Sequence, residues 1–115
     1  MEVNKLYCGD SLDLLDLLDH NPKLIILHPP DNSETTHNPA EYKDFLRNIY
    51  TKCFNKLDDH GVMVSINTDR RQKGIQTKHI DLYNIMAGLN ADLFDYKIWQ
   101  KSVKGNLYIP TFAHI

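Results

Sequence analysis

Several features that would point to particular protein classes are absent from this sequence of 115 residues. No apolar run approaches the roughly 18 residues of a transmembrane helix. The segment Met1–Lys5 lacks the charged-then-apolar pattern of a signal peptide, so we expect a cytoplasmic protein. The only two cysteines, Cys8 and Cys53, do not form a Cys-x-x-Cys pair, and we expect buried free thiols. The six histidines are scattered without ligand spacing, so no metal site is predicted.

A large excess of one charge is also absent, because the formal net charge is −2. The two parts of the chain nevertheless differ. Residues 1–60 hold 6 basic and 11 acidic side chains, whereas residues 61–115 hold 7 basic and 4 acidic ones. The basic residues Arg70, Arg71, Lys73 and Lys78 lie close together and are candidates for contact with a polyanion. A solvated surface with uneven charge is the alternative.

The most informative segment that is present runs from Leu24 to Asp31. Four apolar residues, Leu24–Leu27, stop at His28 and two prolines, which is typical of a buried strand in a parallel sheet. Pro29 and Pro30 stiffen the chain that follows the strand. Since open parallel sheets bind ligands at the carboxyl ends of their strands, this loop is a candidate site. A strand end followed by a tight turn is the structural alternative.

Helical and strand patterns alternate along the rest of the chain. Asn38, Pro39 and Glu41 form a strong helix start before an apolar repeat at every third and fourth residue. Asp10 or Ser11 is suited to cap an earlier helix. The expected strands are Val3–Cys8, Leu24–Leu27, Val62–Ile66, Leu93–Gln100 and Leu107–Phe112, and the expected helices are Leu12–Leu18, 39–57 and Ile75–Leu89.

This order, β-α-β-α-β-α-β-β, predicts an α/β fold with a mainly parallel sheet and helices on both faces. The last two strands have only a short connection, so they should form an antiparallel hairpin at one edge of the sheet. No repeat or low-complexity segment divides the chain, and we expect a single domain over residues 1–115.

Five segments in this order resemble the amino-methyltransferases that modify adenine N6 or cytosine N4 in DNA, in their permuted form. The segments are Asn4–Asp10, Leu24–Asp31, the helix 39–57, Gly61–Asn67 and Ile98-Trp99-Gln100-Lys101. The family pattern is strand-Gly-Asp, strand-Asp-Pro-Pro-Tyr, long helix, Gly-strand, helix and Ile-Trp-x-Lys. The resemblance implies a partial Rossmann-like methyltransferase fold, S-adenosylmethionine as cofactor and DNA as partner.

The family's Asp-Pro-Pro-Tyr motif makes a poor nucleophile reactive. The Asp carboxylate and the first Pro carbonyl accept hydrogen bonds from the target amine, and the aromatic ring stacks on a flipped base. In this chain His28 replaces the Asp and Asp31 replaces the aromatic residue, while Pro29 and its carbonyl are retained. Neutral His offers one acceptor nitrogen and protonated His offers none. His28 is therefore a candidate base for other chemistry, or a surface residue that anchors the loop.

The resemblance also assigns roles to residues outside that motif. Asp10 corresponds to the family's contact near the cofactor adenine, or is simply a helix cap. Trp99 and Lys101 are framing residues, with Trp99 as a core residue the alternative. The family's Phe-x-Gly-x-Gly cofactor loop is missing, so we expect either the N-terminal part of a longer protein or a remnant without its cofactor half.

The missing half has a structural consequence for the sheet. In the family fold it supplies two strands between the strand before Gly-Asp and the strand before Pro-Pro. We therefore expect residues 3–8 to pair directly beside Leu24–Leu27, or a homodimer or a second chain to complete that edge.

Three functions remain open from the sequence. The first is half of a DNA amino-methyltransferase, inactive alone, which would bind S-adenosylmethionine. The second is a non-catalytic or regulatory module whose basic loop would bind DNA in a salt-dependent way. The third is a self-associating structural relic without a small ligand.

Overall fold

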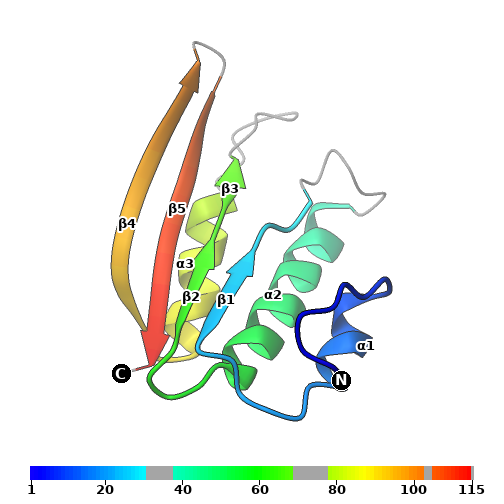
Figure 1. Ribbon diagram of the computed structural model, residues 1–115. Coiled ribbons are helices and arrows are strands. Elements are labelled where there is room, and N and C mark those ends of the chain that lie inside the picture. Colours follow the sequence, from blue (N-terminus) through cyan, green and yellow to red (C-terminus); the bar gives the residue numbers. More distant parts are fainter. Residues whose placement is uncertain (31–37, 69–77, 103–104, 115) are drawn as a thin grey trace.

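The computed structural model describes residues 1–30, 38–68, 78–102 and 105–114, and the statements below concern these residues. Three helices and five strands follow one another as shown in Figure 1. In chain order they are α1 (Ser11–Leu15), β1 (Leu24–Leu27), α2 (Pro39–Lys56), β2 (Val62–Ser65), β3 (Asn67–Thr68), α3 (Lys78–Gly88), β4 (Ala91–Ser102) and β5 (Gly105–His114).

All five strands belong to one mixed sheet. β1 and β2 pair in parallel, whereas β5 pairs antiparallel with β2, β3 and β4. Since β2 and β4 both oppose β5, they run in the same direction as each other. The expected hairpin of the last two strands is confirmed, with β4 on the outside and β5 inserted between β4 and β2. That insertion makes most pairings antiparallel, so the prediction of a mainly parallel sheet is corrected to a partly parallel one.

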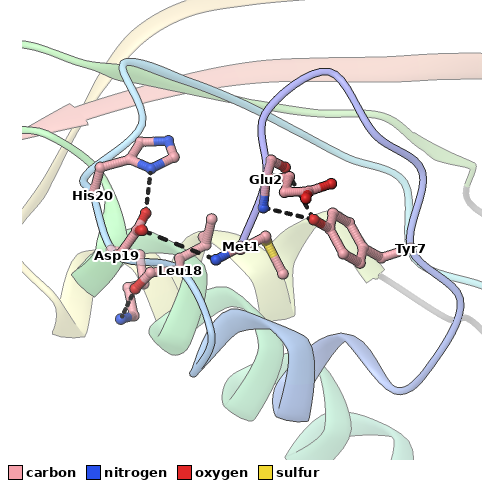
Figure 2. Close-up of polar contacts among 7 residues, drawn as sticks. Met1, Glu2, Tyr7, Leu18, Asp19 and His20 are labelled. Atoms are coloured by element: carbon pink, nitrogen blue, oxygen red, sulfur yellow. Dashed lines mark hydrogen bonds and ion pairs between the residues drawn. The ribbon is translucent and has the colours of Figure 1, made fainter.

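The prediction of a first strand over Val3–Cys8 is wrong, because this segment forms a loop. The Tyr7 hydroxyl accepts a 2.7 Å hydrogen bond from the Glu2 N–H and donates one of 3.0 Å to the Glu2 carbonyl. Asn4 adopts the left-handed region, with φ at 56°, and the Met1 ammonium lies 3.9 Å from the Asp19 carboxylate. Figure 2 shows these contacts closing the N-terminal segment into a loop beside the end of α1.

That loop leaves the edge of β1 without the direct closure expected from residues 3–8. Within the described part of the chain, β1 pairs only with β2. The prediction of direct closure is therefore wrong. The alternative of a second chain that completes this edge stays a prediction.

The core lies between the sheet and its helices. Twelve buried residues form one cluster, which comes mainly from α2 and α3 and includes Met63 of β2 and Phe112 of β5. Ile25 and Leu27 of β1 pack against this cluster, whereas Leu24 and Ile26 are 55% and 63% exposed on the other face. The prediction of a fully buried β1 is therefore wrong. The expectation of helices on both faces is also corrected, since the described helices pack on one face.

The long helix 39–57 is confirmed as α2, with the expected start. The Asn38 side chain accepts a 2.9 Å hydrogen bond from the Glu41 N–H, and Pro39 occupies the first turn. The Asn38 side-chain amide in turn donates a 2.7 Å hydrogen bond to the Glu41 carboxylate. At the other end, Lys52 ties α1 to α2 by donating to the Leu12 carbonyl at 2.5 Å.

The expectation of two buried free thiols is confirmed for one cysteine and wrong for the other. Cys53 is a buried free thiol as expected, whereas Cys8 is exposed because it lies in the N-terminal loop. In the described ranges, no three His, Cys, Asp or Glu side chains gather into a group that could hold a metal ion. None of the described helices combines the length and the apolar character needed to cross a membrane.

Candidate functional site at the Pro-Pro end of strand β1

The parallel pairing of β1 and β2 brings their carboxyl ends to the same edge of the sheet. The Ile66 N–H donates to the Leu27 carbonyl at 2.9 Å, so the pairing continues to the last residue of β1. The chain then leaves the sheet through His28, which is exposed, Pro29, which is buried, and Pro30, which is exposed. The predicted location of the proline pair, at the carboxyl end of a sheet strand, is therefore confirmed.

Helix α2 fixes the position of this loop. The Tyr42 hydroxyl donates a 2.7 Å hydrogen bond to the Pro30 carbonyl. Tyr42 is only 7% exposed and comes from the first turns of α2. Tyr42 belongs to the apolar repeat that predicts this helix, but that pattern does not reveal which loop its hydroxyl contacts.

Lys78 lies over the ring of Tyr42, the residue that contacts this loop. Its ammonium is 5.8 Å from the centre of the Tyr42 ring, within the range of a cation–π contact. The sequence grouped Lys78 with a basic loop that would face a polyanion. The structure makes it the first residue of α3 and buries it to 7% exposure, because α3 packs against α2. Tyr42 thus contacts both the Pro30 carbonyl and the Lys78 ammonium, and so links the loop after β1 to the start of α3.

A buried polar network lies at the end of β2. The Tyr50 hydroxyl is 2.5 Å from the Ser65 hydroxyl and donates to the Asn67 side-chain carbonyl at 3.2 Å. The Asn67 amide donates to Ser65 at 2.6 Å. Burial raises the pKa of Tyr50 above its usual range, although its hydrogen bonds to Ser65 and Asn67 oppose that shift. Tyr50 therefore stays neutral and holds the break between β2 and β3, beside the end of β1.

Sequence reasoning missed this network, although a signal was present. In the strand pattern Val62–Asn67, every second residue from Met63 faces the core. Ser65 and Asn67 share that face, and buried polar groups require hydrogen-bond partners. The pattern therefore demands a polar partner from a neighbouring helix, although it does not identify Tyr50.

Asp10 is the N-cap of α1, as its capping alternative predicts. Its carboxylate is exposed and accepts a 2.9 Å hydrogen bond from the Leu12 N–H. α1 meets α2 at Lys52, ten residues after Tyr42, which corresponds to about 15 Å along the helix. α1 therefore contacts α2 at a different level from Pro30.

The other predicted residues do not gather at the Pro-Pro loop. Trp99 lies in β4 and is 61% exposed, so the alternative of a core Trp is wrong. The remaining residues fall outside what the structure describes, wholly or in their side chains: Asp31, Arg70, Arg71, Lys73 and Lys101. Their predicted roles stay predictions.

No protein-family profile matches the sequence, and no curated protein is similar to it. Solved structures do match. TTHA0409 of Thermus thermophilus, a candidate DNA modification methylase, superposes with a TM-score of 0.79 at 19% identity over 92% of this chain and 50% of that one. Its complex with S-adenosyl-L-methionine gives a TM-score of 0.76 at 18% identity, covering 92% and 51%.

At this identity the likeness establishes the fold alone. A third TTHA0409 structure gives a TM-score of 0.71 over 92% of this chain and 52% of that one. The chain therefore spans about half the length of these structural neighbours. It has a mixed α/β, methyltransferase-like fold that corresponds to half of a candidate DNA modification methylase.

Proposed function

We propose that this chain is the Pro-Pro-containing half of an S-adenosylmethionine-dependent DNA amino-methyltransferase fold, and that it does not methylate DNA alone. It is proposed as a single domain over residues 1–115 that lacks the glycine-rich cofactor loop. The target class is the exocyclic amine of adenine N6 or cytosine N4. The observation that supports the proposal is the position of Pro29 and Pro30 at the carboxyl end of β1, in a fold that matches half of TTHA0409.

The geometry around Pro30 suits the retained part of the motif. An acceptor must point at a target amine from a fixed position, and Tyr42 fixes the loop by its hydrogen bond to the Pro30 carbonyl. The Pro29 carbonyl is the proposed acceptor. His28 is exposed at the end of β1. The resemblance implies that it takes the position of the family's acidic acceptor.

Two substitutions underlie the proposed lack of activity. His28 supplies at most one acceptor nitrogen, where a carboxylate supplies two oxygens. Asp31 has no ring on which a flipped base could stack, and such stacking contributes about 1–3 kcal/mol. The two substitutions therefore weaken both the activation of the target amine and the stacking that holds the flipped base.

The residues present fit the cofactor in one respect. Asp10 presents an exposed carboxylate at the start of α1, with one oxygen engaged by the Leu12 N–H. We propose that the carboxylate also faces the cofactor adenine, as the resemblance implies. S-adenosylmethionine would supply the methyl group. The role of this chain is to hold the adenine end and to present the target amine to the Pro29 carbonyl.

Calorimetric titration with S-adenosylmethionine tests the cofactor part. We expect heat of binding for the wild type and weaker binding for Asp10→Asn. Because Asn caps helices as well as Asp does, Asp10→Asn should keep the wild-type thermal stability, whereas Asp10→Ala should lose both affinity and stability. Absence of both binding heat and a thermal shift in the wild type would contradict this part.

A methyl-transfer assay on duplex DNA tests the catalytic part. We expect no transfer by the wild type, so transfer by the unmodified chain would contradict the proposal. The double variant His28→Asp, Asp31→Tyr restores the family's acceptor and ring and is the matched comparison. DNA binding that weakens steeply with salt, together with no cofactor binding, would instead favour the non-catalytic DNA-binding module.

A further inference from the structure

Strand β4 forms an unusually long edge of the sheet. It runs over twelve residues, Ala91–Ser102, and within the described ranges it pairs only with β5. Figure 1 shows β4 at the outer margin of the sheet, beyond β5. No described strand pairs with its outer side, and monomeric proteins usually protect such a free edge. The Tyr96 N–H donates locally to the Asp95 carboxylate at 2.8 Å, so pairing at this residue would have to exchange that bond.

The edge strand β4 is protected only in part, by the charged side chains Asp95 and Lys97 and by a bulge between Leu93 and Asp95. Five large apolar or aromatic residues of this strand are substantially exposed, namely Leu93 (47%), Phe94 (67%), Tyr96 (38%), Ile98 (56%) and Trp99 (61%). Exposed apolar residues on a free edge favour association with another strand. The other free edge, at β1, offers only four residues.

The order of residues in β4 identifies the partner strand. Tyr96 lies at the centre of a segment whose two arms are chemical complements. On one side come Asp95 and then the apolar Phe94 and Leu93, and on the other come Lys97 and then the apolar Ile98 and Trp99. Such a segment is therefore complementary to a second, antiparallel copy of itself.

The charged residues fix the register of that pairing. Asp95 pairs with Thr111 of β5 and Lys97 with Ile109, so both lie on the same face of the sheet. In one chain their charged groups are 3.0 Å apart, and Lys97 is 71% exposed. In an antiparallel pair centred on Tyr96, Asp95 lies opposite Lys97 of the second copy, and Lys97 lies opposite Asp95. A slip of two residues in either direction would instead place like charges opposite each other.

We propose that two copies of this chain associate through β4, antiparallel about a two-fold axis at Tyr96, to form one continuous sheet. The two helix layers then lie on the same side of the joined sheet, because paired residues in an antiparallel ladder share a face. The bulge between Leu93 and Asp95 lies outside the central three residues that set the register. This proposal does not depend on the proposed function.

Sedimentation velocity on a concentration series of charge variants tests the interface. We expect the wild type to form a dimer. Lys97→Asp places acidic groups opposite each other and Asp95→Lys places basic groups opposite each other, so each single variant should have a dimer dissociation constant raised about tenfold or more. An equimolar mixture of the two single variants should form a heterodimer, because opposite charges then face each other again.

Two controls separate this interface from other causes. The double variant Asp95→Lys, Lys97→Asp reverses both charges and should dimerise like the wild type, even if a single variant folds poorly. Lys23→Asp makes the same charge change next to the β1 edge and should leave the dimer intact. A monomeric wild type, single variants that dimerise as tightly as the wild type, or a mixture or double variant that stays monomeric would each overturn the proposal.

Discussion

The Tyr42 hydroxyl and the Pro30 carbonyl are joined by a 2.7 Å hydrogen bond that links helix α2 to the loop after β1. Because Tyr42 is buried, water replaces this bond poorly if the hydroxyl is removed. The contact therefore couples the start of the longest helix to the position of the proline pair.

Tyr42→Phe should lower the free energy of unfolding by about 0.5–1.5 kcal/mol, since it removes this hydrogen bond and keeps the ring beneath Lys78. Urea denaturation measures the change. Tyr7→Phe is the control, because the Tyr7 hydroxyl bonds to Glu2 within the exposed N-terminal loop and should matter less. Equal losses in the two variants would show that the Pro30 contact has no special weight.

The network of Tyr50, Ser65 and Asn67 should behave as one unit. Tyr50→Phe leaves the Asn67 carbonyl without its buried donor, and Ser65→Ala removes the acceptor of the Asn67 amide. We expect each variant to lose about 1–3 kcal/mol of stability. The double variant should lose less than the sum, with a coupling of about 0.5–3 kcal/mol from a double-mutant cycle.

The control for that cycle pairs Tyr50→Phe with Asn38→Ala. Asn38 caps the start of α2 and shares no partner with Tyr50, so these two losses should add within about 0.5 kcal/mol. If Tyr50 and Ser65 prove as additive as this distant pair, the three side chains do not act as a network.

The sequence was sufficient to predict elements whose signals are local. The start of α2 was predictable because Asn38 and Pro39 act within one helical turn. The range of β1 was predictable because two prolines end it. The antiparallel order of β4 and β5 follows from their short connection. Each of these signals depends on residues close together in the chain.

The errors concern contacts between distant segments. The pattern of Val3–Cys8 suits a strand, but a strand needs a neighbour, and the Tyr7 hydroxyl closes the segment into a loop instead. Similarly, no local signal reveals that β5 inserts between β2 and β4. At the candidate site, the proline pair was predictable, whereas the contacts of Tyr42 and Lys78 depend on how α2 and α3 pack.

Two glycines should respond to alanine in opposite directions. A Cβ at Gly61 would lie 2.8 Å from Leu57 and 2.9 Å from the Lys23 carbonyl, and the backbone atom cannot easily move. Gly61→Ala should therefore destabilise the protein by about 1–3 kcal/mol. A Cβ at Gly88 would meet nothing within 4 Å, so Gly88→Ala should stabilise α3 by about 0.5–1 kcal/mol. Thermal melts of both variants test the signs. A stabilising Gly61→Ala would contradict the packing described around Gly61, and a destabilising Gly88→Ala would contradict the open space at Gly88.

The two cysteines should differ in reactivity. Cys8 is exposed, whereas Cys53 is 3% exposed and its burial raises the pKa of the thiol to about 11. A thiol reagent at neutral pH should label one cysteine quickly and the other only as the protein unfolds. Cys8→Ser should remove the fast phase and leave the slow one. Two fast phases in the wild type would contradict the burial of Cys53.

The same thiol should make stability depend on alkaline pH. The pKa of Cys53 rises on folding from its ordinary value of 9.0 to about 11, so above pH 9 the unfolded chain loses a proton that the folded chain keeps. The stabilisation is complete below pH 9 and is lost as the pH rises toward 11, by about 2–3 kcal/mol in total. Urea denaturation across this range in a Cys8→Ser background measures how the free energy of unfolding changes with pH.

Cys53→Ala is the control for this pH dependence. It should reduce the slope of the free energy of unfolding against pH, whatever it costs in packing at neutral pH, because the group that titrates is gone. An unchanged slope in Cys53→Ala would show that another group, such as the buried Tyr50 hydroxyl, controls the alkaline loss.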